Sequence, residues 1–182
     1  SFPRLHWFCR TFSAPFNKEV NSTMVDSINA VYKKILFCTD FSKNAEFAFH
    51  FALDAASRET DSELHLLHVI PESDAQFWKS YIYEVEDVDE KAKHDIDNHI
   101  DQTYRKFVPR DQNFIAQFKV GNAVQEILNY AKEHEMDLIV IGRQGQSALG
   151  TTLFGKITEK ICRHAECSVL VIPRTYQERF SV

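Results

Sequence analysis

Glycine is scarce in this chain, which has 5 glycines among 182 residues. Long apolar runs are absent as well, since none approaches the roughly eighteen residues that a membrane span needs. We therefore expect no membrane partner. Basic residues do not dominate, because 21 Lys and Arg stand against 26 Asp and Glu, with a net charge of −5. This balance disfavours a nucleic-acid binder, which usually carries a basic face.

Cysteine is also sparse, and none of the 4 cysteines forms a CxxC pair. Cys38 and Cys167 adjoin apolar runs that are typical of strands. We expect the cysteines to be reduced and mostly buried, as in a cytoplasmic protein. Cys38 is expected to be a structural thiol, with a redox role as the alternative.

The first 31 residues lack an acidic side chain before Glu19 and show no helical or strand period. We interpret residues 1–31 as an unstructured extension or the product of an upstream reading frame, with Met24 as the natural start. A weak targeting peptide is the alternative. The predicted domain covers residues 32–174, and residues 175–182 are expected to be a C-terminal tail.

Short apolar runs alternate with amphipathic stretches from residue 34 onward. The runs predict strands at 34–40, 63–70, 113–121, 138–142 and 167–173. The amphipathic stretches predict helices at 42–57, from about 84, at 122–137 and at 152–164. Such alternation predicts an α/β fold: a five-stranded, parallel, doubly wound, Rossmann-like sheet with helices on both faces. Ligands of such sheets bind at the carboxyl ends of the strands, where the strand order switches.

The period of each stretch also predicts which side chains face the core. Ser42 is the expected N-cap of the first helix. The third strand is expected to place Phe114, Ala116, Phe118 and Val120 on one face. The expected inward residues of the helices are Val124, Ile127, Leu128 and Ala131 of the third helix, and Leu153, Ile157 and Ile161 of the last helix.

Four of the glycines follow the fourth predicted strand, in "IGRQGQSALGTTLFGKITEKI". The segment "GTTLFGKIT" is similar to a Walker A phosphate loop, but Ile157 occupies the position of the Mg²⁺-binding hydroxyl. Gly150 also lies too far beyond the strand for that loop. The spacing G-x2-G-x9-G fits Gly142, Gly145 and Gly155 instead. It places Gly155 at the start of a helix, whose free N–H groups favour an anion.

Three segments together resemble the universal stress protein family, in particular its ATP-binding branch. They are "YKKILFCTDFSKNAEFAF", "LLHVI" and "DLIVIGRQGQSALGTTLFGKITEKICRHAECSVLVIP". The resemblance extends from Tyr32 to about Arg174. It implies the fold of the adenine-nucleotide alpha-hydrolase type, a bound ATP (or AMP or ADP) with Mg²⁺ possible beside it, and a homodimer joined through Ser168–Pro173.

The resemblance also implies the residues of the nucleotide site. Asp40 matches the acid that bonds the ribose hydroxyls, with Thr39 beside it, and Val69 matches the residue whose backbone contacts adenine. Arg143 and Gln144 occupy the variable positions that face the phosphates. The complete predicted set is Thr39, Asp40, Val69, Gly142, Arg143, Gln144, Gly145, Gly155, Lys156 and Ile157.

Lys156 is the main departure from the family pattern, because a small hydroxyl residue is expected there. Its ammonium group could replace the hydroxyl with a charge-assisted contact to phosphate. Alternatively, its long side chain could crowd the site, as in members that bind no nucleotide.

The predicted function is that of a nucleotide-responsive stress or signalling module. The alternatives are a dimeric interaction protein whose site is altered by Lys156, and a slow ATPase. No catalytic residue is predicted, since the sequence shows a place to hold a nucleotide and no machinery to cleave it.

Other clusters carry weaker signals. Cys162, His164 and Cys167 supply three ligands for a zinc site, but their spacing crosses a helix end. The acidic residues around 84–101 are expected to form a solvated helix face, together with His94 and His99. His65 and His68 are expected to be ordinary strand residues. No metal site is predicted.

Overall fold

The computed structural model describes residues 32–73, 88–143, 155–177 and 179, and every statement below concerns these residues. The chain forms a single five-stranded parallel sheet in the order β3-β2-β1-β4-β5. Its strands are β1 (Lys34–Thr39), β2 (Glu63–Ile70), β3 (Asn113–Val120), β4 (Leu138–Arg143) and β5 (Ser168–Pro173). The predicted fold class is confirmed.

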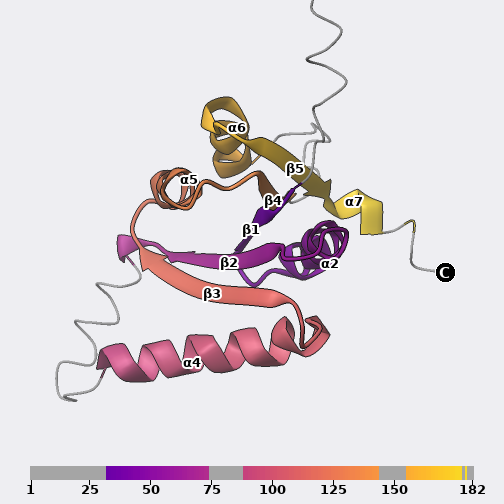
Figure 1. Ribbon diagram of the computed structural model, residues 1–182. Coiled ribbons are helices and arrows are strands. Elements are labelled where there is room, and N and C mark those ends of the chain that lie inside the picture. Colours follow the sequence, from indigo (N-terminus) through magenta and orange to yellow (C-terminus); the bar gives the residue numbers. More distant parts are fainter. Residues whose placement is uncertain (1–31, 74–87, 144–154, 178, 180–182) are drawn as a thin grey trace, which may run out of the picture. The chain divides into compact units, whose positions relative to one another are not determined.

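Helices cover both faces of this sheet (Figure 1). The described helices are α2 (Lys43–Ser57), α4 (Val88–Thr103), α5 (Ala123–Glu133), α6 (Lys156–His164) and α7 (Arg174–Gln177). A short 3₁₀ turn at Arg105–Phe107 follows α4. The predicted starts near residues 84 and 152 for α4 and α6 lie outside the described residues.

Alternation along the two central strands divides the core into two layers. Ile35 and Phe37 of β1 point toward α2 and the end of α4. Leu36 and Cys38 point toward α5 and α6. Both faces of β1 are therefore buried, as expected for a parallel strand between crossover helices.

The first core layer is rich in aromatic rings. Phe37 meets Phe49 of α2 at 5.3 Å between ring centroids, and Tyr104 lies 4.9 Å from Phe49 and 5.5 Å from Phe37. Edge-to-face and tilted pairs of this kind stabilise the core beyond the apolar area that they bury. Tyr104 is only 1% exposed and connects the end of α4 to this layer.

The ends of helices α2 and α5 agree only in part with the prediction. Ser42 caps α2 as predicted, since its hydroxyl accepts a hydrogen bond from the Ala45 backbone N–H. Asn122 caps α5 in the same way. However, α5 ends at Glu133, before the predicted limit of 137. Glu135 has a positive φ of 53°, which a continuing right-handed helix cannot contain.

One predicted core position, Ile157, is wrong, and one residue of the predicted β3 face is more exposed than the others. Val120 is 49% exposed, because β3 is an edge strand and its last residue lies at the end of the sheet. Ile157 is 45% exposed, since the sheet-facing side of α6 carries Thr158 and Ile161 instead. Tyr130 of α5 was not predicted, although it is 1% exposed. Residues 174–177, expected to lie mainly in the tail, form α7, where Tyr176 contacts Phe51.

His65 occupies the second core layer with a complete set of partners. Its Nε2 lies 3.3 Å from the Glu63 carboxylate and its Nδ1 lies 2.9 Å from the Tyr130 hydroxyl. Because a carboxylate only accepts hydrogen bonds, Nε2–H donates to Glu63 and Nδ1 accepts from Tyr130. Burial lowers the pKa of His65, and the bond to Glu63 only partly opposes this.

We expect the fold to lose stability in mild acid, because His65 is buried and His68 is half-buried. Burial also lowers the pKa of His68. The unfolded chain protonates near pH 6.5, whereas the native state resists protonation, so unfolding binds protons. Stability is therefore full above about pH 7 and falls as the pH drops below about 6.5. Thermal melts between pH 8 and 5 measure this dependence.

A matched pair of variants identifies the source of that pH dependence. His65→Gln is expected to show a shallower loss in acid than the wild type. His94→Gln, which changes an exposed ring, is expected to keep the wild-type slope. A melting temperature that stays flat between pH 7.5 and 5.5 would contradict the prediction.

Candidate functional site

The two central strands separate at their carboxyl ends. The pairing of β1 with β4 ends at Cys38 and Ile141. Beyond that pair, Thr39 continues in register with β2, whereas Gly142 continues in register with β5. This is the point at which the strand order reverses, and doubly wound sheets bind ligands there. We call Thr39, Asp40, Gly142 and Arg143 the switch point.

Asp40 is the exposed residue that follows β1, and its carboxylate has one backbone partner. Oδ1 accepts a hydrogen bond from the Ser42 N–H at 3.0 Å. Thr39 before it is buried, with a relative exposure of 6%. The structure thus brings the two predicted residues to the end of β1, with one side chain in the core and the other open to solvent.

Phe41 completes the turn after β1 in an unusual conformation. Its φ is 58°, which is uncommon for a residue other than glycine, asparagine or aspartate. Its N–H donates to the Thr39 hydroxyl at 2.9 Å. Its ring lies between His68 and His99, with centroid distances of 4.5 and 4.4 Å. His94 and His99 are both exposed, as predicted. The ring of His99 also packs against Phe41 of this turn.

The end of β2 lies beside the end of β1. His68 pairs with Thr39 in the sheet register, and its Nδ1–H donates to the Thr39 carbonyl at 2.9 Å. Val69 follows and is half-buried against the second core layer. The structure therefore places the predicted adenine-contacting residue at the carboxyl edge of the sheet, next to the switch point.

Gly142 is required by packing inside the fold. A Cβ at this position would lie 3.0 Å from the Asn44 carbonyl oxygen and 2.8 Å from its side-chain nitrogen. The first turn of α2 therefore leaves no room for a side chain at residue 142. Asn44 is 5% exposed, and its Oδ1 has no hydrogen-bond partner in the part of the chain that the structure describes.

Gly155 differs from Gly142 in its surroundings. It is the N-cap of α6, and among the described residues a Cβ there would meet only the Thr158 hydroxyl, at 3.9 Å. As a glycine, it has no side chain with which to cap the helix. Lys156 and Ile157 follow in the first turn with exposed side chains. The first N–H groups of such a helix end are suited to an anion.

The structure describes only part of the predicted phosphate loop. Arg143 ends β4 and is half-buried, whereas Gln144 and Gly145 lie outside the described residues, as does Gly150. Of the predicted set, Thr39, Asp40, Val69, Gly142 and Arg143 gather at the carboxyl edge of neighbouring strands. Gly155, Lys156 and Ile157 form the start of the helix that follows β4 in the chain.

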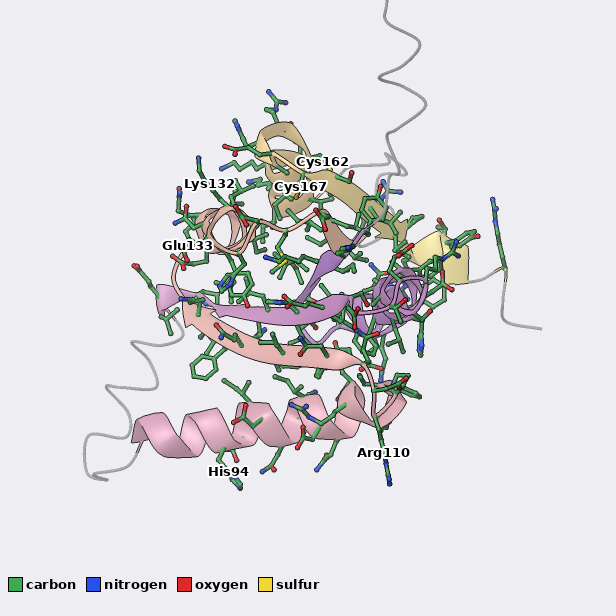
Figure 2. The ribbon with its side chains drawn as sticks, viewed as in Figure 1. His94, Arg110, Lys132, Glu133, Cys162 and Cys167 are labelled. Carbon is green, nitrogen blue, oxygen red and sulfur yellow. The ribbon has the colours of Figure 1, made fainter. Side chains whose placement is uncertain are left out.

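The alternative sites receive little support. Cys38 is 5% exposed, and burial raises the pKa of its thiol, so it is held as the neutral, unreactive form. Cys162 on α6 is exposed, which corrects the expectation of mostly buried cysteines; Figure 2 labels it together with Cys167. Within the described ranges, no group of three or more His, Cys, Asp or Glu side chains could hold a metal ion.

One groove, of about 320 Å³, lies between α2 and residues 102–107. Its lining combines Lys43, Glu46 and Lys106 with the rings of Phe47 and Phe107. None of the predicted site residues lines it, so it is separate from the switch point.

Three residues that support the switch point were not predicted: Phe41, Asn44 and Tyr104. Tyr104 Oη lies 2.6 Å from Thr39 Oγ1 across 65 positions of sequence. A contact over that separation leaves no local pattern. The sequence also contained no indication of the positive φ of Phe41, because phenylalanine rarely adopts that conformation.

These features define a doubly wound α/β domain whose candidate site lies at the switch point between β1 and β4. The sequence profile described as the Universal stress protein family matches residues 31–173. The chain therefore belongs to the universal stress protein family.

Individual relatives agree with this assignment. A universal stress protein of Staphylococcus haemolyticus is 32% identical over 145 residues, covering 78% of this chain and 84% of its own. Among solved structures, the universal stress protein UspA from Lactobacillus plantarum is 30% identical, with a TM-score of 0.62 and coverage of 79% and 99%.

A more distant structure shares the fold. It is a universal stress protein from Archaeoglobus fulgidus in complex with dAMP, which is 18% identical to this chain with a TM-score of 0.52. The alignment covers 78% of this chain and 98% of that one. Within the part of the chain that the structure describes, no helix is both long and apolar enough to cross a membrane.

Proposed function

We propose that this domain binds an adenine nucleotide, ATP, at the carboxyl ends of β1 and β4, and that it acts as a nucleotide-responsive stress or signalling module in the cytoplasm. The observation that carries the proposal is the separation of the two strand ladders after Cys38 and Ile141. The exposed carboxylate of Asp40 follows directly on one side of this point, and Gly142 and Arg143 follow on the other.

The chemistry of the switch point suits a nucleoside phosphate. Asp40 accepts hydrogen bonds and matches the family residue that bonds ribose hydroxyls. Arg143 and Lys156 are cationic, and the N-terminus of α6 presents free N–H groups to phosphate oxygens. The dAMP complex of the Archaeoglobus fulgidus protein, and a further family structure in complex with cAMP, support the capacity of this fold to hold an adenylate. Mg²⁺ would accompany the phosphates of ATP.

Lys156 is proposed to assist binding. Its side chain is exposed in the first turn of α6, so its long stem has room to turn away from the phosphates or toward them. Its backbone N–H lies in the first turn of α6, whose N-cap Gly155 has no side chain that could accept a hydrogen bond from it. These features favour the binding hypothesis over that of an interaction protein with a blocked site.

Calorimetry and thermal melts with millimolar Mg-ATP test the function. The wild type is expected to release heat and to melt at a higher temperature, because a ligand that binds only the native state stabilises it. Lys156→Ser is expected to bind ATP about 5- to 10-fold more weakly, because a neutral hydroxyl contact replaces a charge-assisted one. No heat and no melting shift in the wild type would refute nucleotide binding, whereas tighter binding by Lys156→Ser would show that the lysine obstructs the site.

A homodimer through β5 is part of the proposal. β5 is an edge strand whose Leu170 is 37% exposed, and unpaired apolar edges are prone to associate. Pairing of two copies of Ser168–Pro173 would satisfy that edge. A monomeric mass by light scattering at micromolar protein would contradict it.

A further inference from the structure

The turn that carries Asp40 is held from both sides by residues of other elements. Thr39 Oγ1 accepts the Phe41 N–H and shares a hydrogen bond of 2.6 Å with Tyr104 Oη. The Thr39 carbonyl accepts the Nδ1–H of His68. The Phe41 ring packs between His68 and His99 and stacks on Tyr104 at 6.1 Å.

This turn needs external support, because Phe41 has a φ of 58°. A residue with a Cβ is disfavoured in the left-handed region and stays there only where its surroundings enforce it. The bond from the Phe41 N–H to Thr39 fixes that conformation. The Thr39 hydroxyl is in turn oriented by Tyr104, because Thr39 is only 6% exposed and its bond to Tyr104 is buried.

Tyr104 is suited to this task by its own packing. It is 1% exposed, its ring is held by Phe37 and Phe49, and burial raises its pKa to about 12. Its hydroxyl therefore stays protonated at neutral pH. Either oxygen of the Thr39–Tyr104 pair can be the donor, and both arrangements fix the rotamer of Thr39.

We propose that Tyr104 is a positioning residue of the nucleotide site: through the Thr39 hydroxyl and the Phe41 N–H, it sets the orientation of the Asp40 carboxylate toward the ribose hydroxyls. This inference rests on the proposed function, since it assigns Asp40 the ribose. If the inference is right, the buried hydroxyl group of Tyr104 determines how strongly the domain prefers ribose to a sugar without the 2′ and 3′ hydroxyls.

The chain offers a matched control in Tyr130. Tyr130 is also 1% exposed, and its hydroxyl also bonds one buried partner, His65, but it lies in the other core layer. Tyr104→Phe and Tyr130→Phe therefore remove the same atom from comparable surroundings. A merely structural role of Tyr104 would make the two variants behave alike toward a nucleotide.

The test compares affinities for ATP and 2′,3′-dideoxy-ATP, which lacks both ribose hydroxyls. Tyr104→Phe is expected to bind ATP about 5- to 10-fold more weakly, with little change for the dideoxy compound, as for the loss of one buried hydrogen bond. Tyr130→Phe is expected to keep the wild-type preference. Thr39→Ser keeps the hydroxyl and is expected to keep the preference, whereas Thr39→Val is expected to lose it. In an Asp40→Asn background, Tyr104→Phe should add no further loss.

Two results would overturn the inference. The first is a preference for ATP over the dideoxy compound that Tyr104→Phe leaves intact. The second needs no nucleotide: amide exchange of Phe41, followed by NMR, should accelerate in Tyr104→Phe and not in Tyr130→Phe, and equal rates refute the positioning role. A different result would show that the proposed function is wrong. The wild type would bind neither ATP nor the dideoxy compound, while the exchange of the Phe41 amide would still differ between Tyr104→Phe and Tyr130→Phe.

Discussion

Replacement of Asp40 by asparagine is expected to weaken ATP binding about 10- to 100-fold, as for the loss of one charge-assisted hydrogen bond of roughly 1.5–3 kcal/mol. The folded state should be nearly unaffected, because Asp40 is exposed. The bond that its Oδ1 accepts from the Ser42 N–H can also be made by the amide oxygen of asparagine. The change therefore removes the charge and keeps the local turn.

Isothermal calorimetry with ATP measures the affinity, and a thermal melt without nucleotide checks the fold. Asp54→Asn is a suitable control, since Asp54 is exposed on α2 and its ion pair with Arg58 lies on the helix surface, where such pairs contribute little. An Asp40→Asn affinity within twofold of the wild type would show that this carboxylate does not contact the nucleotide.

Replacement of Gly142 by valine is expected to destabilise the fold itself. The new Cβ would lie 3.0 Å from the Asn44 carbonyl oxygen and 3.1 Å from its carbonyl carbon, which are backbone atoms at the start of α2. Overpacking of this kind costs about 1–3 kcal/mol, which corresponds to a fall in melting temperature of roughly 3–10 °C for a domain of this size. Urea or thermal denaturation without nucleotide measures the change.

Gly155→Ala is the contrasting variant. Among the described residues, no atom lies closer than 3.9 Å to a Cβ at Gly155, and the backbone angles of −55° and 144° suit any residue. Gly155→Ala is expected to lower the melting temperature by only about 1–3 °C, because alanine is a weaker N-cap than glycine. Equal melting temperatures for Gly142→Val and the wild type would show that α2 can move aside. If the prediction holds, loss of ATP binding in Gly142→Val says little about the site, and Gly155 is the better glycine for probing it.

The sequence predicted the architecture because its signals were local and repeated. The continuous apolar runs at Ile35–Cys38 and Leu138–Ile141 predict strands that are buried on both faces, and both are. The positions of Asp40 and Gly142 at the ends of those strands followed from the same runs, combined with the family resemblance. Ser42 was identified as a cap because its residue type and position carry the whole signal.

The errors have physical causes that a local pattern does not contain. Ile157 was expected inside because it lies four residues before Ile161, but α6 is short and turns Thr158 to the sheet instead. Val120 alternates correctly along β3, yet the edge position of the strand leaves it exposed. The packing of Gly142 against Asn44 was not predicted, because the α2 backbone comes from a distant part of the chain.

The separation of the strand ladders at the switch point has a mechanical consequence. The three strands on one side and the two on the other meet along a single seam, the short ladder between β1 and β4 that ends at Cys38 and Ile141. A nucleotide bound by Asp40 on one part of the sheet and by the β4–α6 segment on the other would connect the two parts at the carboxyl end of that ladder. Nucleotide binding would then restrict the movement of the two parts of the sheet relative to each other, without any change in the fold.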